Sequence, residues 1–325
     1  MFMNVKVAKN LITQFAAVSA FLISISSMAQ SFDDFVRQGS DGSRWRPDVI
    51  YGDDDRLDWY DIKNEAIQNV ARSSVALISS AKLSTSQTQG WIKINAGRYG
   101  DEMQMCSSER FVDQPSATFC SGFLAAGDRV ITAGHCIQSE AECKATSFVF
   151  DFTVFDAKYD PSQVPASAVY NCKRVIHQEL DRDGHDFAVI ELDRVVTDRS
   201  PVKIHRGGKI ADDAPLNVIG YPHGIPLKSS IGKMRSNDQA NYFVATLDTY
   251  GGNSGSMVLN ENTLEVEGIL VRGEPDVVYD GAKGCYVSKI CKLDECNGEE
   301  STRISLAIPY LDGAVRSGNW WDNER

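Results

Sequence analysis

The sequence is poor in positive charge. It has 33 lysines and arginines against 44 aspartates and glutamates, a formal net charge of −11, and no basic cluster. Nucleic acids and anionic membrane surfaces are recognised through concentrated positive charge, so we expect neither as a partner. Histidine is scarce as well, with five in 325 residues, which leaves few candidates for a general base.

Long apolar runs are absent after residue 29, so no later segment is predicted to span a bilayer. The first 29 residues carry two lysines without an acid, an apolar stretch over 11–25 and a small-x-small sequence over 27–29. This pattern predicts a secretory signal peptide whose removal leaves Gln30 first. A membrane anchor is the alternative, but polar residues interrupt the stretch and no basic stop follows it. We therefore expect an exported protein, secreted or periplasmic.

The sequence also lacks a CxxC pair, and no histidine stands close to Cys285, Cys291 and Cys296. Structural zinc sites are built from such groups, so we expect no metal. All eight cysteines follow the signal peptide, and an even number in an exported chain predicts disulfides. Among them, Cys143 and Cys172 are a candidate pair.

The remaining composition is that of a globular protein, with 42% hydrophobic and 24% charged residues. Residues 30–48 are polar and rich in glycine and serine, so they predict a propeptide or linker before one domain over 49–325. A short helix is expected over 61–72, and a second one, interrupted by Pro309, within 301–316. Short runs rich in β-branched and aromatic residues predict an all-β fold, sandwich or barrel. These runs cover residues 75–78, 117–124, 129–133, 147–154, 170–176, 186–192, 216–220, 242–247, 256–259 and 265–271.

A glycine-flanked serine occupies the centre of residues 250–256, Tyr-Gly-Gly-Asn-Ser-Gly-Ser. Glycines on both sides allow a tight turn in which successive backbone N–H groups point at one spot. Ser254 is therefore a candidate nucleophile, with the N–H groups of Gly252 and Ser254 as candidate oxyanion donors. The alternative is an ordinary surface turn, which the same residues would also form.

Two further stretches supply a base and an acid. A strand-like run ends on His135, and another begins on Asp186. A serine needs such a base to take its proton, and the base needs an acid to orient it. Asp181 and Asp183 are rival acids, but they lie in the loop before the strand. His185 neighbours Asp186, and adjacent strand residues point to opposite faces, so we expect His185 at the surface.

Together, Thr-Ala-Gly-His-Cys at 132–136, Asp-Phe-Ala-Val-Ile at 186–190 and Gly-Asn-Ser-Gly-Ser at 252–256 resemble the chymotrypsin-like serine peptidases. The order His, Asp, Ser is that of this family, and the resemblance covers roughly residues 70–312. It implies two antiparallel six-stranded β-barrels, with His135 and Asp186 on the first and Ser254 on the second. It also implies a Cys120–Cys136 disulfide next to the base.

The activity implied by the resemblance is that of a monomeric serine endopeptidase, acting on proteins or peptides through an acyl-enzyme, without metal or organic cofactor. A catalytically inactive fold-mate that serves as a binding protein is one alternative, and an esterase using the same triad is another. Inactive relatives usually lose a triad residue, whereas all three motifs stand here.

Within the family, the Val-Ile at 49–50 and the charged segment after it resemble the mature start of the bacterial glutamyl endopeptidases. The motif Asn-Ser-Gly-Ser at 253–256 also resembles that of the same branch. This likeness implies that a zymogen is processed to begin at Val49. A charged surface loop is the alternative interpretation of the segment.

Three residues are candidates for the specificity pocket. Asp248 lies six residues before Ser254, where trypsin-like enzymes bind Arg or Lys. Leu270 stands where glutamyl endopeptidases carry a histidine, and Arg272 offers either a replacement charge or a solvated rim residue. Asn253 is uncharged, so it cannot pair with a new N-terminal ammonium as the aspartate of animal relatives does. Both preferences, acidic and basic, stay open. The insertion 272–300 is interpreted as a stapled surface loop or as a wall of the substrate cleft, and both interpretations can hold together.

Overall fold

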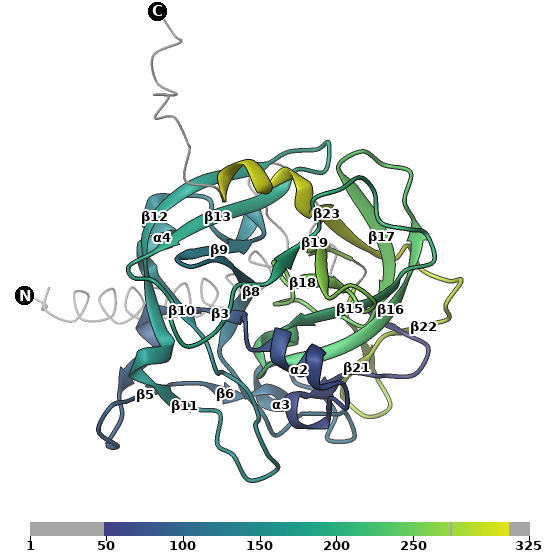
Figure 1. The fold of residues 1–325 in the computed structure, drawn as a ribbon. Coiled ribbons are helices and arrows are strands. Elements are labelled where there is room, and N and C mark those ends of the chain that lie inside the picture. The colour runs from purple at the N-terminus through teal and green to yellow at the C-terminus, as the bar shows by residue number, and fades with distance from the viewer. Residues whose placement is uncertain (1–48, 274, 312–325) are drawn as a thin grey trace, which may run out of the picture. The chain divides into compact units, whose positions relative to one another are not determined.

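Six strands between residues 74 and 192 close into an antiparallel barrel (Figure 1, left). In the computed structural model, which describes residues 49–273 and 275–311, the barrel core contains the buried side chains of Val75, Phe123, Ile131 and Phe148. The strands, in order around the barrel, are β10 (Thr146–Val149), β12 (Val169–Leu180), β13 (Asp186–Leu192), β9 (Arg129–Thr132), β8 (Thr118–Ala126) and β3 (Ser74–Ser79).

A second antiparallel barrel follows in the chain (Figure 1, right, green). It closes because the last strand of the series, β23, pairs with β19 as well as with β17. Its core contains the buried side chains of Leu216, Phe243, Val258 and Leu270. Around this barrel lie β15 (Pro215–Gly220), β16 (Lys228–Ser236), β17 (Tyr242–Leu247), β23 (Glu299–Arg303), β19 (Glu265–Arg272) and β18 (Met257–Asn260). The all-β fold with two six-stranded barrels is thus confirmed.

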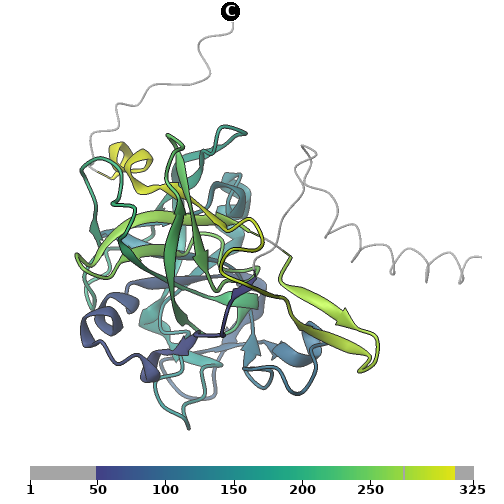
Figure 2. The same cartoon turned by 90° about the vertical axis from the view of Figure 1, so that its right-hand side faces the viewer.

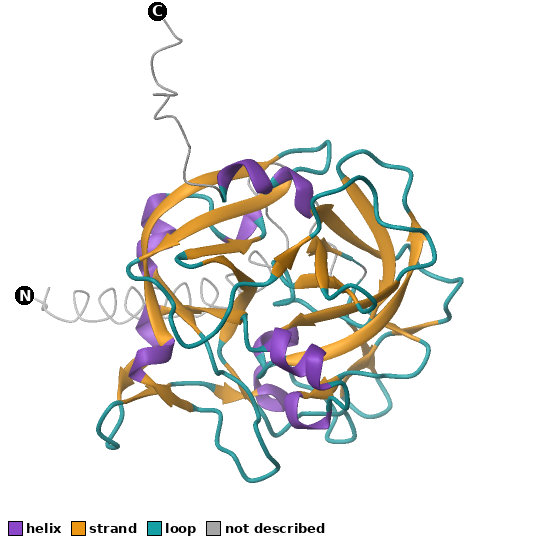
Figure 3. Cartoon of the chain, in the orientation of Figure 1, coloured by secondary structure: helices purple, strands orange, loops and turns teal. Residues whose placement is uncertain are grey.

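Helices are few and short among the described residues (Figure 3). The expected helix over 61–72 is α2 (Glu65–Ala71), which Asn64 caps by accepting the Ala66 N–H at 3.0 Å. The others are α3 (Tyr99–Glu102), α4 (Glu140–Ala145) and the 3₁₀ turns η1 (Trp59–Asp61), η2 (Ser80–Lys82), η3 (Gly134–Cys136), η4 (Ala166–Ala168), η5 (Pro222–Gly224), η6 (Ile304–Leu306) and η7 (Ile308–Tyr310). No helix in the described ranges is long and apolar enough to cross a membrane.

The C-terminal helix expected over 301–316 differs from the observed structure. Residues 301–303 belong to strand β23, and the chain then forms two single 3₁₀ turns separated by Ala307. Pro309 lies in the second of these turns, and its ring favours a break at this point. The remainder of the expected helix, from residue 312 on, lies outside the described residues, as do the expected signal peptide and propeptide.

The segment after Val49 is built into the second barrel. Strand β1 (Ile50–Tyr51) pairs in parallel with β22 (Ile290–Cys291), and β2 (Leu57–Asp58) pairs with β16. Short strands extend the rest of the fold: β4 (Leu83–Thr85) and β11 (Gln163–Pro165) flank β5 (Trp91–Ile94), β6 (Gly97–Arg98) pairs with β7 (Pro115–Ser116), and β14 (Lys203–Ile204) joins β19.

The insertion 272–300 forms a hairpin of β20 (Val277–Asp280) and β21 (Cys285–Ser288). Figure 2 shows this hairpin, in yellow-green, extending away from the barrels. The Cys106–Cys285 disulfide ties it to the loop that follows α3, and Cys291–Cys296 closes a small loop beside it. The insertion is therefore a stapled loop, as one of the two interpretations had it. The expected pairs Cys120–Cys136 and Cys143–Cys172 are both present.

Candidate active site

His135 lies in the turn η3, directly after strand β9. Its backbone N–H donates to Asp186 Oδ1 at 3.0 Å, and its ring Nδ1 lies 2.8 Å from Asp186 Oδ2. Gly134 is required here, because a Cβ would lie 2.1 Å from the carbonyl oxygen of Glu179. Asp186 is 2% exposed and opens β13, which pairs with β9. The two adjacent strands of the first barrel thus bring the sequence-predicted base and acid together.

The rival acids lie elsewhere. Asp181 Oδ2 is 2.5 Å from the ring Nδ1 of His185, and Asp181 Oδ1 accepts the N–H of Asp183 at 2.8 Å. These residues form a partly exposed group at the turn before β13. Among the three candidate aspartates, Asp186 is the one whose carboxylate contacts His135.

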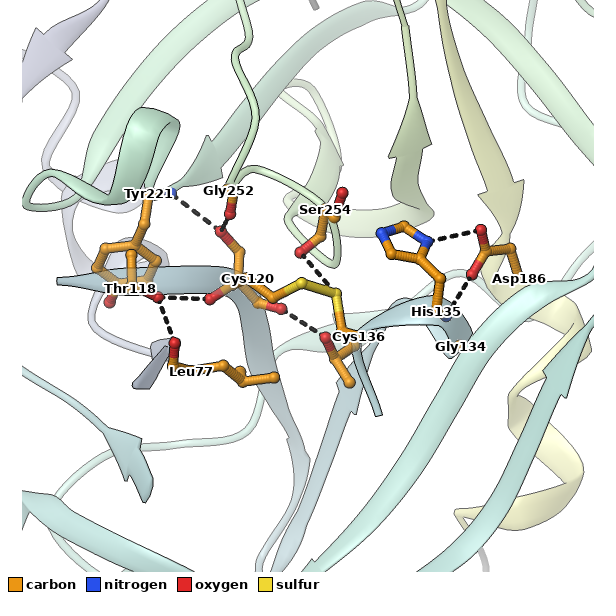
Figure 4. The surroundings of a disulfide bond; sticks show 12 residues. Leu77, Thr118, Cys120, Gly134, His135, Cys136, Asp186, Tyr221, Gly252 and Ser254 are labelled. Carbon is orange, nitrogen blue, oxygen red and sulfur yellow. Dashed lines mark hydrogen bonds and ion pairs between the residues drawn. A yellow bond between two sulfur atoms is a disulfide. The ribbon is translucent and has the colours of Figure 1, made fainter. Parts of the chain in front are cut away.

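Ser254 comes from the other barrel, in the loop between β17 and β18. The loop is held against the first barrel: Ser121 donates its N–H to Ser254 O at 2.8 Å and its Oγ to Gly252 O at 2.7 Å. Gly255 has φ +90°, and a Cβ there would lie 2.0 Å from the carbonyl oxygen of Ser121. Figure 4 shows the result, with the imidazole of His135 between Asp186 and Ser254.

Two N–H groups of this loop have no hydrogen-bond acceptor among the described residues. The N–H groups of Asn253 and Gly255 donate to backbone carbonyls at 2.9 and 2.7 Å. Across residues 49–273 and 275–311, neither the N–H of Gly252 nor that of Ser254 has a protein acceptor. Gly252 has φ +94°, a conformation that favours glycine, so the turn can present these two groups as neighbours. They are available to an oxyanion.

Arg272, a pocket candidate, lies close to the carboxylate of Asp186. Its Nη2 is 3.7 Å from Asp186 Oδ2, and its Nη1 is 3.4 Å from Glu300 Oε2. The guanidinium is 35% exposed. Two carboxylates therefore share its charge, and Arg272 bears on the electrostatics of the His135–Asp186 pair.

Asp248 is engaged by the N-terminal segment. Its Oδ1 accepts the Tyr51 N–H at 2.7 Å and its Oδ2 accepts the Asp55 N–H at 3.1 Å. The carboxyl is 3% exposed, and this burial raises its pKa to about 7. Leu270 is fully buried in the core of the second barrel, among Leu216 and Phe243. Neither side chain is presented to solvent.

Asn253, the neutral residue before Ser254, has a local role. Its Oδ1 accepts the Ser256 hydroxyl at 3.1 Å, and the side chain is buried. This bond closes the turn from within. On the other side of His135, a depression of about 310 Å³ is lined by Ser79, Phe119, His135, Cys136, Gln138, Glu142, Ala145 and Thr146.

A buried group behind the serine loop was missed by the sequence analysis. His223 Nε2 lies 2.6 Å from Asp276 Oδ2, and that oxygen also accepts the Gly251 N–H at 2.9 Å. The two residues are 53 positions apart and belong to no motif. No periodicity or spacing signal in the chain could have paired them.

Comparisons with known proteins give one family match and several similar solved structures. A family model described as the trypsin-like peptidase domain matches residues 120–269, a span that holds His135, Asp186 and Ser254. No curated protein matches this chain. The solved structures that are similar to it include the following two. A Glu endopeptidase in complex with MPD has 17% identity and a TM-score of 0.49 over 81% of this chain and 97% of that chain. The VesB protease of Vibrio cholerae has 13% identity and a TM-score of 0.45 over 81% of this chain and 66% of that one.

Proposed function

We propose that this chain is an exported serine endopeptidase of the trypsin-like family, whose model matches residues 120–269, and that it acts through Ser254, His135 and Asp186. The observation that carries the proposal is the convergence of these three side chains from two barrels, beside two N–H groups without protein acceptors. A nucleophile, an oriented base and oxyanion donors are the parts that acyl transfer needs.

In the proposed reaction, the Ser254 hydroxyl attacks the carbonyl carbon of the scissile peptide while His135 Nε2 takes its proton. The bond between His135 Nδ1 and Asp186 fixes the tautomer and stabilises the imidazolium. The N–H groups of Gly252 and Ser254 would receive the oxyanion of the tetrahedral intermediate. The imidazolium then protonates the leaving amine, and a water activated by the same base hydrolyses the acyl-enzyme.

The contacts of the pocket candidates weigh on specificity. Asp248 already accepts two backbone N–H groups, so a carboxylate waiting for an Arg or Lys side chain is not supported at this position. Arg272 lies between Asp186 and Glu300, which leaves little net positive charge for an acidic substrate residue. We therefore propose peptide substrates without assigning the residue before the scissile bond.

The two alternatives find no specific support. An inactive binding protein would be free to lose the base, the acid or the glycines of the turn, and all of them are in place. Ester hydrolysis would use the same residues, since esters are cleaved by the same acyl transfer. It is thus a companion activity of the proposed site rather than a separate function.

Labelling with a fluorophosphonate tests the proposal. The folded protein is expected to take up one probe, which peptide mapping places on Ser254. Heat-denatured protein and the Ser254→Ala and His135→Ala variants are expected to take up none. Ser107→Ala, at an exposed turn, is the matched serine control and should label like the wild type. Labelling at another serine, or none in folded wild type, would contradict the assignment.

A further inference from the structure

We propose that His223 and Asp276 are positioning residues that hold the peptide unit carrying the Gly252 N–H in its oxyanion-binding orientation. This inference rests on the proposed function, because it concerns how the oxyanion donors are set. Both side chains are buried, with 2% exposure for His223 and 8% for Asp276. Neither has a part in the triad, so the reaction described above leaves this buried His–Asp pair without a role.

Three loops at one end of the second barrel bring the pair behind the serine loop. His223 lies in η5 between β15 and β16, Asp276 follows β19, and Gly251 and Gly252 follow β17. The approach is close: a Cβ on Gly252 would lie 2.7 Å from the Tyr221 carbonyl oxygen and 3.4 Å from the His223 nitrogen. Glycine at 252 is therefore needed for the loops to meet.

The contacts converge on Gly251, the residue before the oxyanion donor. Its N–H donates to Asp276 Oδ2 at 2.9 Å, and its carbonyl accepts the His223 N–H at 2.5 Å. That carbonyl belongs to the same planar peptide unit as the Gly252 N–H, and the two point in opposite directions. Holding the Gly251 carbonyl toward His223 therefore directs the Gly252 N–H the other way. A flip of this peptide would withdraw the donor, and it would break the bond to His223.

The His223 ring is fixed on several sides. Its Nε2 lies 2.6 Å from Asp276 Oδ2, its Nδ1 lies 2.9 Å from the Tyr99 hydroxyl, and it stacks on Tyr250 at 4.3 Å between ring centroids. This fixing matters because His223 has φ +48°, which non-glycine residues seldom adopt. The ring contacts hold the backbone in the conformation that presents its N–H to Gly251.

Asp276 links the His223 ring to the backbone of Gly251. One oxygen, Oδ2, serves both the His223 ring and the Gly251 N–H. Within the described residues, its other oxygen is buried without a hydrogen-bond partner. A buried carboxylate with an unsatisfied oxygen destabilises the folded protein, so its presence calls for an explanation. The rigid placement of Gly251 supplies that explanation.

The test compares His223→Ala and Asp276→Ala with wild type on a fluorogenic peptide chosen from a library, and measures inhibition by a boronate of the same peptide. Loss of one oxyanion donor typically lowers kcat by about 10²–10³-fold. We expect kcat to fall by about 10²-fold, the boronate inhibition constant to rise in parallel, and KM to change less than about threefold. His223→Gln, which can still donate to Asp276, should recover most of kcat.

His205→Gln is the matched control, since His205 pairs with Glu267 elsewhere in the second barrel, and it should keep wild-type kinetics. Thermal melting identifies variants that do not fold, in which case His223→Gln and Asp276→Asn decide the matter. Wild-type kcat and boronate affinity in folded variants would overturn the inference, as would a change confined to KM. If wild type itself neither cleaves peptides nor labels at Ser254, the proposed function fails instead.

Discussion

A positive charge lies close to the His135–Asp186 pair, because Arg272 Nη2 is 3.7 Å from Asp186 Oδ2. A cation there offsets the carboxylate and opposes formation of the imidazolium. We predict that Arg272→Gln moves the acid limb of the kcat/KM profile to higher pH. Partly exposed ion pairs contribute about 0.2–1 kcal/mol, so the move should be about 0.7 of a pH unit or less.

Glu300→Gln should move the acid limb of the kcat/KM profile in the opposite direction. Glu300 shares the charge of Arg272, so its neutralisation leaves the guanidinium more effective on Asp186. The acid limb should then move to lower pH. Identical limbs in the wild type and both variants would show that Arg272 is only a rim residue.

Asp248 gives a second prediction at the residue scale. Burial raises its pKa from 3.8 to about 7, so the native state binds this proton more tightly than the unfolded chain. The contribution of this proton to the free energy of unfolding is therefore fully present below about pH 4, and it is lost as the pH rises through about 7. Asn stays neutral at every pH and does not lose this contribution. The free energy of unfolding of Asp248→Asn, relative to that of the wild type, should therefore increase between pH 4 and 8 by up to about 4 kcal/mol.

Urea titrations of both proteins at several pH values measure this difference. Parallel stability curves would contradict the assigned ionisation. The same variant also separates two roles of the residue. If Asp248 anchors Tyr51 and Asp55, Asp248→Asn should keep the cleavage preference of the wild type. A collapse of cleavage after Arg or Lys would return Asp248 to the pocket.

At the scale of residues, the sequence singles out candidates where a motif surrounds them. His135, Asp186 and Ser254 each stand in a recognisable stretch, and the structure brings them together. His223 and Asp276 stand in none, and their meeting depends on how three loops close one end of a barrel. The sequence singles out Arg272 as a charged candidate, but not the partner of that charge. The contact with Asp186 arises because Arg272 is the last residue of β19, which the local sequence does not place beside Asp186.

At the scale of elements, the sequence predicts those strands that contain a run of apolar residues. All ten predicted runs overlap strands of the two barrels, whereas two further barrel strands, β16 and β23, and the short strands outside the barrels were missed. Strand β23 reads Glu-Glu-Ser-Thr-Arg, and Glu299, Ser301 and Thr302 are nonetheless fully buried. Such a strand is stabilised by its ladders to β17 and β19, which no hydrophobic pattern reveals.

The disulfides yield the prediction that belongs to elements. Cys106–Cys285 joins residues 179 apart and holds the β20–β21 hairpin, whereas Cys291–Cys296 joins residues 5 apart. Cross-links that close longer loops restrict the unfolded chain more. The Cys106→Ser/Cys285→Ser variant should therefore lose about 3 kcal/mol more in free energy of unfolding than Cys291→Ser/Cys296→Ser. Equal losses in urea titrations would contradict this account of the hairpin.

For the whole molecule, the segment after residue 48 is part of the peptidase body. Val49 is fully buried beside Tyr51 and Cys291, and its carbonyl accepts the Thr249 N–H at 3.3 Å. Composition predicts a propeptide or linker over 30–48, but it could not show that 49–58 would pair with β22 and with β16 of the second barrel. That role arises from contacts with strands more than 150 residues away in the chain.

We predict that the exported protein begins at or near Val49. A chain that starts at Val49 should melt like the exported form, whereas one that starts at Leu57 should lose the β1 pairing and the Asp248 contacts and melt far lower. Intact mass of the exported protein and thermal melting of both truncations measure this. A stable N-terminus at Gln30 with full activity would contradict the processing prediction.

The central claim is that Ser254 is the nucleophile of an endopeptidase. Its most direct test is the hydrolysis rate of a peptide library by purified wild type and by Ser254→Ala, with melting curves to show that both are folded. We predict cleavage by wild type and a loss of about four orders of magnitude or more in the variant. A folded Ser254→Ala protein that keeps most of the activity would contradict the account.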